Sequence, residues 1–238
     1  MGAKLHKWHR RIGLLASAFI IFLVSTGIVL QHSDELGLPT KHLASGWLLN
    51  YYGIKPNPIT TYQLGNQTIS HAGYNLYLSG RPIVENVNNL FGVIYLDNQI
   101  IIATSNSLIV IDHDGNLFDE ITKLDGLVES PLGISKSADQ TLILRGITKY
   151  WESKNDLYNW QEYNGAHPKW ATPSITLPAL RQVIEAHDMS QQISLERFLL
   201  DAHSGRIFGK YGIYIIDVAA ILLMVLASTG IWLWFARR

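Results

Sequence analysis

Residues Tyr211 to Phe235 read YGIYIIDVAAILLMVLASTGIWLWF, a run of twenty-five residues with a single charge, Asp217. A second apolar run, Ile12 to Leu30, reads IGLLASAFIIFLVSTGIVL and has nineteen residues without a charge. A bilayer core about 30 Å thick is crossed by roughly 20 helical residues. Both runs therefore predict transmembrane helices, and the rest of the fold must lie between or beside them.

The net charge of zero hides a difference between the ends of the chain and its middle. The two ends carry six basic residues and no acid, whereas residues 32–210 carry thirteen Lys and Arg against eighteen Asp and Glu, a net charge of −5. Short basic flanks stay in the cytoplasm, so both termini are expected there and the middle outside. No basic stripe indicates nucleic-acid binding.

A cleaved signal peptide is the alternative interpretation of the first apolar run. Nineteen apolar residues exceed the usual core of a signal peptide, and no small-residue cleavage site follows Leu30. The run therefore favours an uncleaved anchor.

These patterns divide the chain into four parts. They predict a cytoplasmic leader at 1–11, a membrane helix at 12–31, a periplasmic domain at 32–210 and a second membrane helix at 211–236. The domain is expected to be β-rich over 59–165 and helical over 177–203. The predicted fold class is an α+β membrane protein, in which an antiparallel helix hairpin flanks a mainly antiparallel β domain. The chain has no cysteine, so disulfides are excluded.

Short β-branched or aromatic runs separated by turn residues predict strands in the middle of the chain. Their connections are too short for crossovers and indicate an antiparallel meander. Propeller blades would also fit, although no repeat period is visible. The expected helices are Lys41–Tyr52, Ala179–His187 and Ser194–His203, and the expected strands are Phe91–Leu96, Gln99–Thr104, Ser107–Ile111, Leu117–Ile121, Thr141–Arg145, Ile147–Trp151 and Leu157–Tyr163.

The two apolar runs share a tetrapeptide near their C-terminal ends. Ser25–Ile28 and Ser228–Ile231 both read Ser-Thr-Gly-Ile. In helices of opposite direction this is a small inverted repeat, a pattern of membrane proteins whose sites lie between the repeats. Generic helix packing by small residues is the alternative.

Three histidines are candidate ligands of haem iron. His32 and His203 lie next to membrane helices on the expected outer side, where adjacent antiparallel helices would bring them together. Imidazoles from two helices commonly hold haem iron. His9 faces the opposite surface, and its partner would be His6 or the His9 of a second subunit. Interfacial histidines that only cap helix ends are the alternative.

Asp217 and Arg206 are further candidate site residues. An ionisable group inside a membrane span is a functional candidate, although Asp217 is close enough to the outer end to reach water. The sequence has no Gly-x-Ser-x-Gly, His-Glu-x-x-His or P-loop motif, so nothing favours hydrolytic chemistry.

Both ends of the chain resemble a known family. Trp8 to Leu14 (WHRRIGL), leading into a span that ends in Ser-Thr-Gly, resembles the first span of the PepSY-associated transmembrane proteins. Leu200 to Gly209 (LDAHSGRIFG), followed by a span that ends in STGIWLW, is similar to the other signature of the family. By position, the signature histidines of the family correspond to His9 and His203. The β region between them resembles nothing recognisable.

The resemblance implies a bacterial inner-membrane protein, often tied to iron or siderophore uptake. Some members are haem-containing reductases that pass electrons to periplasmic ferric substrates. Larger members have four helices, so a two-helix chain implies either a homodimer that rebuilds the four-helix arrangement or a role without the full electron path. The leading hypothesis is a ferric-reductase-like protein that binds haem b through His9, His32 and His203 and reduces a periplasmic iron complex or redox partner. The alternatives are a membrane-anchored periplasmic binding module without redox activity and a regulator of periplasmic proteolysis.

Overall fold

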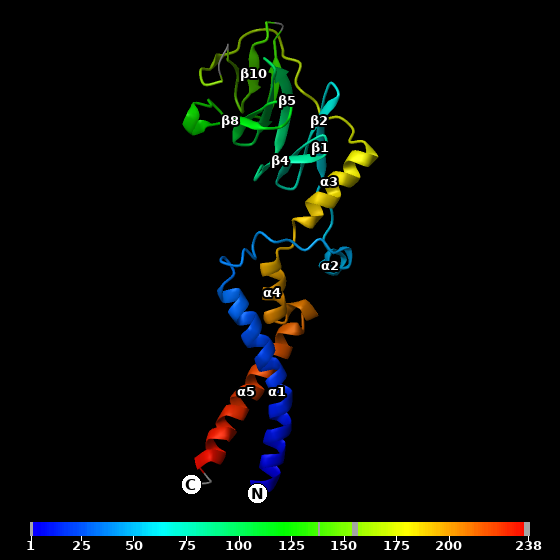
Figure 1. Ribbon diagram of the computed structural model, residues 1–238. Coiled ribbons are helices and arrows are strands. Elements are labelled where there is room, and N and C mark those ends of the chain that lie inside the picture. The colour runs from blue at the N-terminus through cyan, green and yellow to red at the C-terminus, as the bar shows by residue number, and fades with distance from the viewer. Residues whose placement is uncertain (1, 138, 154–156, 236–238) are drawn as a thin grey trace. The chain divides into compact units, whose positions relative to one another are not determined.

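The computed structural model describes residues 2–137, 139–153 and 157–235 (Figure 1). The chain forms two compact units. One comprises residues 1–53 and 190–238, and the other comprises residues 54–189. The first unit therefore joins the two ends of the chain, and the second is formed by the segment between them.

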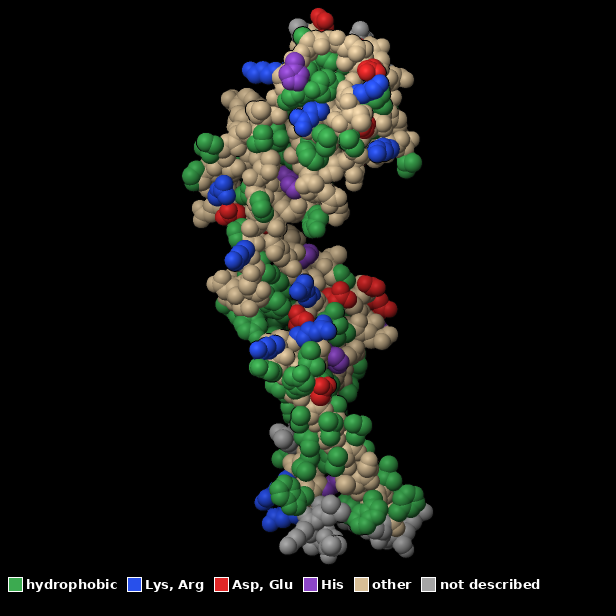
Figure 2. All heavy atoms as spheres, turned by 180° about the vertical axis from the view of Figure 1, so that it is seen from behind, with side chains coloured by type: hydrophobic (Ala, Val, Ile, Leu, Met, Phe, Trp, Pro, Cys, Tyr) green, Lys and Arg blue, Asp and Glu red, His purple; other side chains and the backbone are tan. Residues whose placement is uncertain are grey.

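Two long helices, α1 (Gly2–Gln31) and α5 (Gly212–Phe235), form most of the first unit. Both are long and apolar enough to cross a membrane, as the two apolar runs predicted. Few of their side chains are buried, and hydrophobic side chains cover much of their outer surface (Figure 2). The helices contact each other, with the start of α1 beside the end of α5 (Figure 1). The expected leader at 1–11 is continuous with α1 from Gly2 onwards.

The first unit also contains α2 (Gly46–Tyr51), α4 (Leu195–His203) and the 3-10 turn η2 (Arg206–Phe208). Helix α4 begins where the sequence predicted, because the Ser194 side chain accepts a hydrogen bond from the backbone N–H of Arg197.

The helix expected over 41–52 is wrong in its first half. The backbone N–H of Leu43 donates to the Ile193 carbonyl, and the N–H of Leu195 donates to the Lys41 carbonyl. Because these groups pair with another segment, residues 41–43 cannot enter a helix, and α2 begins only at Gly46.

The second unit contains three four-stranded antiparallel sheets, each a meander in chain order. The expected meander is thus confirmed, and it occurs three times. The strands are β1 (Ile59–Leu64), β2 (Gln67–Ala72), β3 (Asn75–Leu78) and β4 (Arg81–Glu85); β5 (Leu90–Leu96), β6 (Gln99–Thr104), β7 (Ser107–Ile111) and β8 (Leu117–Thr122), followed by the turn η1 (Lys123–Asp125); and β9 (Gly133–Lys136), β10 (Leu142–Arg145), β11 (Tyr150–Ser153) and β12 (Gln161–Glu162).

Two expected strands differ from the structure. The strand expected at 147–151 is β11, which begins only at Tyr150, because the Gly146 N–H donates to the Lys149 carbonyl and closes a turn. The strand expected at 157–163 is reduced to β12, because the Trp160 indole donates to the Leu157 carbonyl and bends the chain.

The sheets are arranged like blades whose first strands are neighbours. Strand β5 contacts both β1 and β9. The chain then returns past the first strands of the outer blades: the Ala171 N–H donates to the Ile134 carbonyl in β9, and the Ser174 N–H donates to the Thr61 carbonyl in β1. The blade-like alternative drawn from the sequence therefore describes the sheets, with a single returning segment beside β1 and β9.

The middle sheet is buried on both faces. Ile100, Ile102 and Ile109 belong to one core cluster with residues of the first sheet, whereas Ile101 and Leu108 belong to another with residues of the third. Successive side chains of a strand point to opposite faces. This explains why β6 and β7 are almost continuously apolar.

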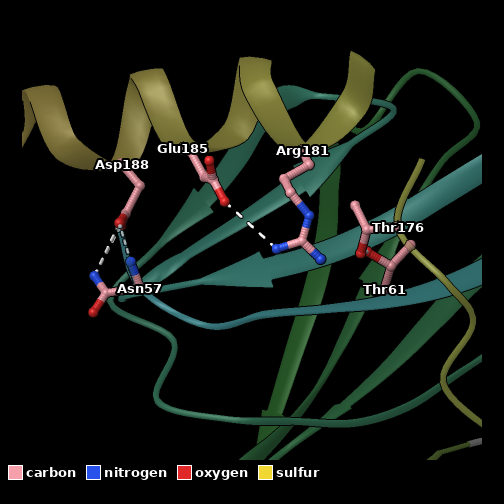
Figure 3. A network of polar contacts seen from close by, with 6 residues as sticks. All are labelled: Asn57, Thr61, Thr176, Arg181, Glu185 and Asp188. Atoms are coloured by element: carbon pink, nitrogen blue, oxygen red, sulfur yellow. Dashed lines mark hydrogen bonds and ion pairs between the residues drawn. The ribbon is translucent and has the colours of Figure 1, made fainter. Parts of the chain in front are cut away.

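Helix α3 (Pro178–Ser190) covers the first sheet (Figure 3). Ile184 is fully buried and packs with Tyr77 and Ala72. At the end of the helix, the buried Asp188 carboxylate accepts hydrogen bonds from the backbone N–H of Asn57 (3.3 Å) and from its side-chain amide (2.9 Å). The amphipathic helix predicted at 179–187 is confirmed, and the Asp188–Asn57 contact fixes its end.

Candidate functional site: two histidine–threonine pairs

His203 is the last residue of α4, and its ring lies against the end of α1. Its Nδ1 is 2.7 Å from the hydroxyl oxygen of Thr26. A Cβ atom added to Gly27 would lie 3.6 Å from the His203 Cε1, so the ring lies beside this glycine. The ring is partly buried.

His9 makes the corresponding contacts at the other end of the helix pair. Its Nδ1 is 2.9 Å from the hydroxyl oxygen of Thr229, near the end of α5. A Cβ atom added to Gly230 would lie 3.6 Å from the His9 Cε1. The two histidines are thus held in the same way by equivalent residues of the repeated tetrapeptide.

Each copy of the repeated tetrapeptide therefore contacts a histidine from the other half of the chain. The Thr-Gly pair of α1 holds His203, which precedes α5, and the Thr-Gly pair of α5 holds His9, which lies in α1. Sequence reasoning found the repeat and both histidines but did not join them. The only signal was the recurrence of Ser-Thr-Gly, and it did not show which histidine each copy contacts.

The two histidine–threonine pairs are far apart along α1. His9 and Thr26 are separated by seventeen residues, which corresponds to about 25 Å at the rise of an α-helix. This is close to the thickness of a bilayer core, about 30 Å. No single small cofactor can contact both rings, so the pairs are two separate sites.

Two glycines allow α4 and α5 to approach each other after His203. Gly205 has a φ of +78°, a conformation that favours glycine. A Cβ atom on Gly212 would overlap the Gly205 carbonyl oxygen. The chain can therefore turn sharply from α4 into α5 only because both positions lack a side chain, and this turn places His203 beside α1.

The opposite side of α4 is held by a tyrosine. The Tyr52 hydroxyl donates to the Asp201 carboxylate at 3.0 Å, and Asp201 lies two residues before His203. Burial, with the hydrogen bond and charge of Asp201, raises the pKa of Tyr52 to about 12. Residues two apart point to nearly opposite sides of a helix. The Asp201 contact therefore helps to orient α4 with His203 toward α1.

A family model described as the PepSY-associated TM region matches residues 2–237. The chain belongs to this family. The match includes the β unit as well as both helices, so it extends beyond the two ends on which the resemblance was recognised. Searches among curated proteins and among solved structures gave no match. Family membership and the two apolar helices make it a membrane protein.

In this PepSY-associated protein, His32 lies apart from the two pairs. Its Nδ1 is 2.9 Å from a Glu35 carboxylate oxygen, and both side chains are largely exposed. His203 contacts Thr26, six residues before His32, which is about 9 Å along α1. Within the described chain, the expected proximity of His32 and His203 is not seen as a contact. His6, the other expected partner of His9, has a side chain outside the described residues.

Asp217 and Arg206 are both exposed, and neither side chain has a hydrogen bond or ion pair within the described residues. The same part of the chain contains no group of three or more His, Asp or Glu side chains that could hold a metal ion.

The β unit carries a separate cavity of about 630 Å³ beside β10 and β11. Its lining includes Tyr150, whose ring centroid is 5.2 Å from that of Trp170 and 5.9 Å from that of His167. Arg145 also lines the cavity and is exposed. The Tyr150 ring is tilted against both neighbouring rings. Aromatic rings beside an exposed guanidinium suit a planar anion.

Proposed function

We propose that this protein binds haem b and carries electrons across the bacterial inner membrane to a periplasmic acceptor, a ferric iron complex being the acceptor class. The observation that supports the proposal most is the pair of histidines held through Nδ1. Each ring keeps its Nε2 unbonded within the described chain, and the rings lie at opposite ends of two apolar helices. An electron can then enter near one face and leave near the other.

The donor atoms fit haem iron. A neutral imidazole with its Nδ1–H hydrogen bonded offers Nε2 as a metal ligand. When bound, haem b supplies one-electron chemistry, and its axial ligands and burial set the potential. His203 would provide an axial ligand near one face and His9 near the other, and the exposed His32 stays a candidate at the outer end.

A second copy of the chain would complete each site. One chain places one threonine-held histidine at each end, and a second chain would add a second histidine to hold the haem there. A homodimer would supply His9 twice at one end and His203 twice at the other. Two sites shared by two chains predict one haem per chain.

The charge distribution supports the proposed topology. Basic residues at both termini favour the cytoplasmic side, and an antiparallel hairpin would then leave the acidic middle of the chain in the periplasm. His9 would lie near the cytoplasmic face and His203 near the periplasmic face, the direction required for delivery to a periplasmic acceptor.

An optical spectrum tests this function. Full-length protein is purified in mild detergent from haem-replete cells, and spectra are taken oxidised and reduced with dithionite. We expect a Soret band with sharp α and β bands on reduction, about half the haem in His203→Ala, and no loss in His113→Ala, whose histidine is an exposed turn residue of the β unit. Protein that is colourless, and stays so after titration with haem, would refute the proposal.

The second candidate is a membrane-anchored binding module, and the aromatic cavity beside Tyr150 and Trp170 favours it. Calorimetric titration with salicylate, a planar aromatic anion, tests it. Binding that is lost in Arg145→Gln and Trp170→Ala but kept in His203→Ala would support this function. Absence of binding together with a haem spectrum would favour electron transfer.

A further inference from the structure

We propose that Thr26 and Thr229 are positioning residues that fix the tautomer and orientation of His203 and His9, each acting on the histidine of the other half of the repeat. The Nδ1–H form is held, so Nε2 is the atom presented to a ligand. The identity of that ligand as haem iron rests on the proposed function. The hydrogen-bond arrangement itself is independent of the proposed function.

The proton positions follow from the donors available. The Thr26 hydroxyl lies 2.8 Å from the carbonyl of Phe22, one turn earlier in α1, and the Thr229 hydroxyl lies 2.8 Å from the carbonyl of Val225. A hydroxyl has one proton to donate. When it donates to the helix carbonyl, its oxygen can only accept from the histidine, which must then carry its proton on Nδ1.

The opposite tautomer is disfavoured by its surroundings. It would place a proton on Nε2, and the Nε2 atoms of His9 and His203 have no hydrogen-bond acceptor within the described residues. A donor left without an acceptor is strongly unfavourable in hydrocarbon. An unpaired acceptor at Nε2 is less unfavourable than an unpaired donor, and a bound ligand would satisfy it.

The threonine holds one edge of each ring through the Nδ1 contact. The glycine that follows leaves space beside that edge, since a Cβ added there would lie 3.6 Å from Cε1. The repeated threonine therefore specifies which nitrogen carries the proton, and it leaves Nε2 available to a ligand.

The serines that precede the threonines provide matched controls. Ser25 and Ser228 are exposed, and the Ser228 hydroxyl donates to the Met224 carbonyl of its own helix. Ser25→Ala and Ser228→Ala remove a hydroxyl from the same helix turn without touching a histidine contact. Thr26→Val and Thr229→Val remove the bonding hydroxyl at nearly constant volume, and Thr26→Ser keeps it.

The test is NMR of the full-length protein in detergent without haem, using ¹⁵N-histidine and two-bond ¹H–¹⁵N correlations to read each tautomer. The wild type should show Nδ1–H at His9 and His203. Thr26→Val should change only His203 and Thr229→Val only His9, whereas the serine variants and Thr26→Ser should match the wild type. A wild-type Nε2–H form, or no change in the valine variants, would overturn the proposal.

Haem titration separates this inference from the proposed function. If haem binds, Thr26→Val should weaken its affinity by roughly 10- to 100-fold, as loss of an outer hydrogen bond to a metal-binding histidine does, and Thr26→Ser should restore it. If the tautomers behave as expected but wild-type protein takes up no haem, the haem function fails and the positioning role stands. Equal affinity in Thr26→Val and wild type would refute positioning toward haem.

Discussion

Replacing Asp188 by alanine should destabilise the β unit by about 3–5 kcal/mol. The carboxylate is 3% exposed, and it accepts from two donor groups of Asn57, the backbone N–H and the side-chain amide. Hydrogen bonds to charged groups contribute about 1.5–3 kcal/mol each, and a buried donor left without a partner costs about 1–3 kcal/mol. Two such hydrogen bonds would contribute about 3–6 kcal/mol, and the upper end of that range is not expected because Asn57 is only partly buried.

Glu185 on the same helix provides the matched control. Its carboxylate lies 3.5 Å from the Arg181 guanidinium, and its side chain is 29% exposed (Figure 3). Exposed ion pairs four residues apart on a helix contribute about 0.3–0.5 kcal/mol. Glu185→Ala should therefore change stability by less than about 1 kcal/mol.

The assay is urea unfolding of the full-length protein in mild detergent, followed by near-UV circular dichroism, with Asn57→Ala and the double variant completing a cycle. Residues in contact through buried hydrogen bonds show coupling energies of about 0.5–3 kcal/mol. If Asp188→Ala costs no more than Glu185→Ala, or if the Asp188 and Asn57 effects simply add, the reasoning is refuted.

Two further predictions concern the same unit. Burial, with the nearby Asp188 carboxylate, raises the pKa of Tyr77 from 10.0 to about 12. Because the pKa is higher in the folded state, the protonated phenol stabilises the fold below pH 10. That stabilisation is lost as the pH rises from 10 to 12. In unfolding measurements between pH 10 and 12, the wild type should lose about 2–3 kcal/mol more stability than Tyr77→Phe, and an equal loss in both proteins would contradict this prediction. Gly92→Ala should lower the stability of the fold by about 1–3 kcal/mol through overpacking, because its Cβ would lie 2.6 Å from the Ile134 Cγ2. Gly46→Ala is the control, since its Cβ would have nothing within 4 Å and should be nearly neutral. Thermal unfolding of both variants measures the difference.

The internal repeat of the β unit shows how far sequence reasoning could have gone. The first turn of each sheet carries Asn or Asp followed by Gln, at Asn66-Gln67, Asn98-Gln99 and Asp139-Gln140. These turns include positive φ angles at Gly65, at Asp97 and Asn98, and at Gln140. The signal in the sequence is weak, because the copies are unequally spaced and share only a Gln and the Asn or Asp before it.

The pairing of residues 41–43 with 193–195 could not be read from the sequence. Local propensity favoured a helix from Lys41. In the structure, the backbone groups of residues 41–43 instead form strand-like hydrogen bonds with a segment about 150 residues later. Tertiary contacts override weak helix propensity.

The sequence by itself determined the two apolar helices, the meander around β5 to β8, the N-cap of α4 and the family. Each depends on composition or spacing within a short window, where hydrophobic transfer, side-chain alternation and turn chemistry act locally. Only the tertiary structure decided that His9 meets Thr229 and His203 meets Thr26. Those partners are 220 and 177 residues apart, and a hydrogen bond of under 3 Å depends on how the two helices pack, which no local pattern specifies.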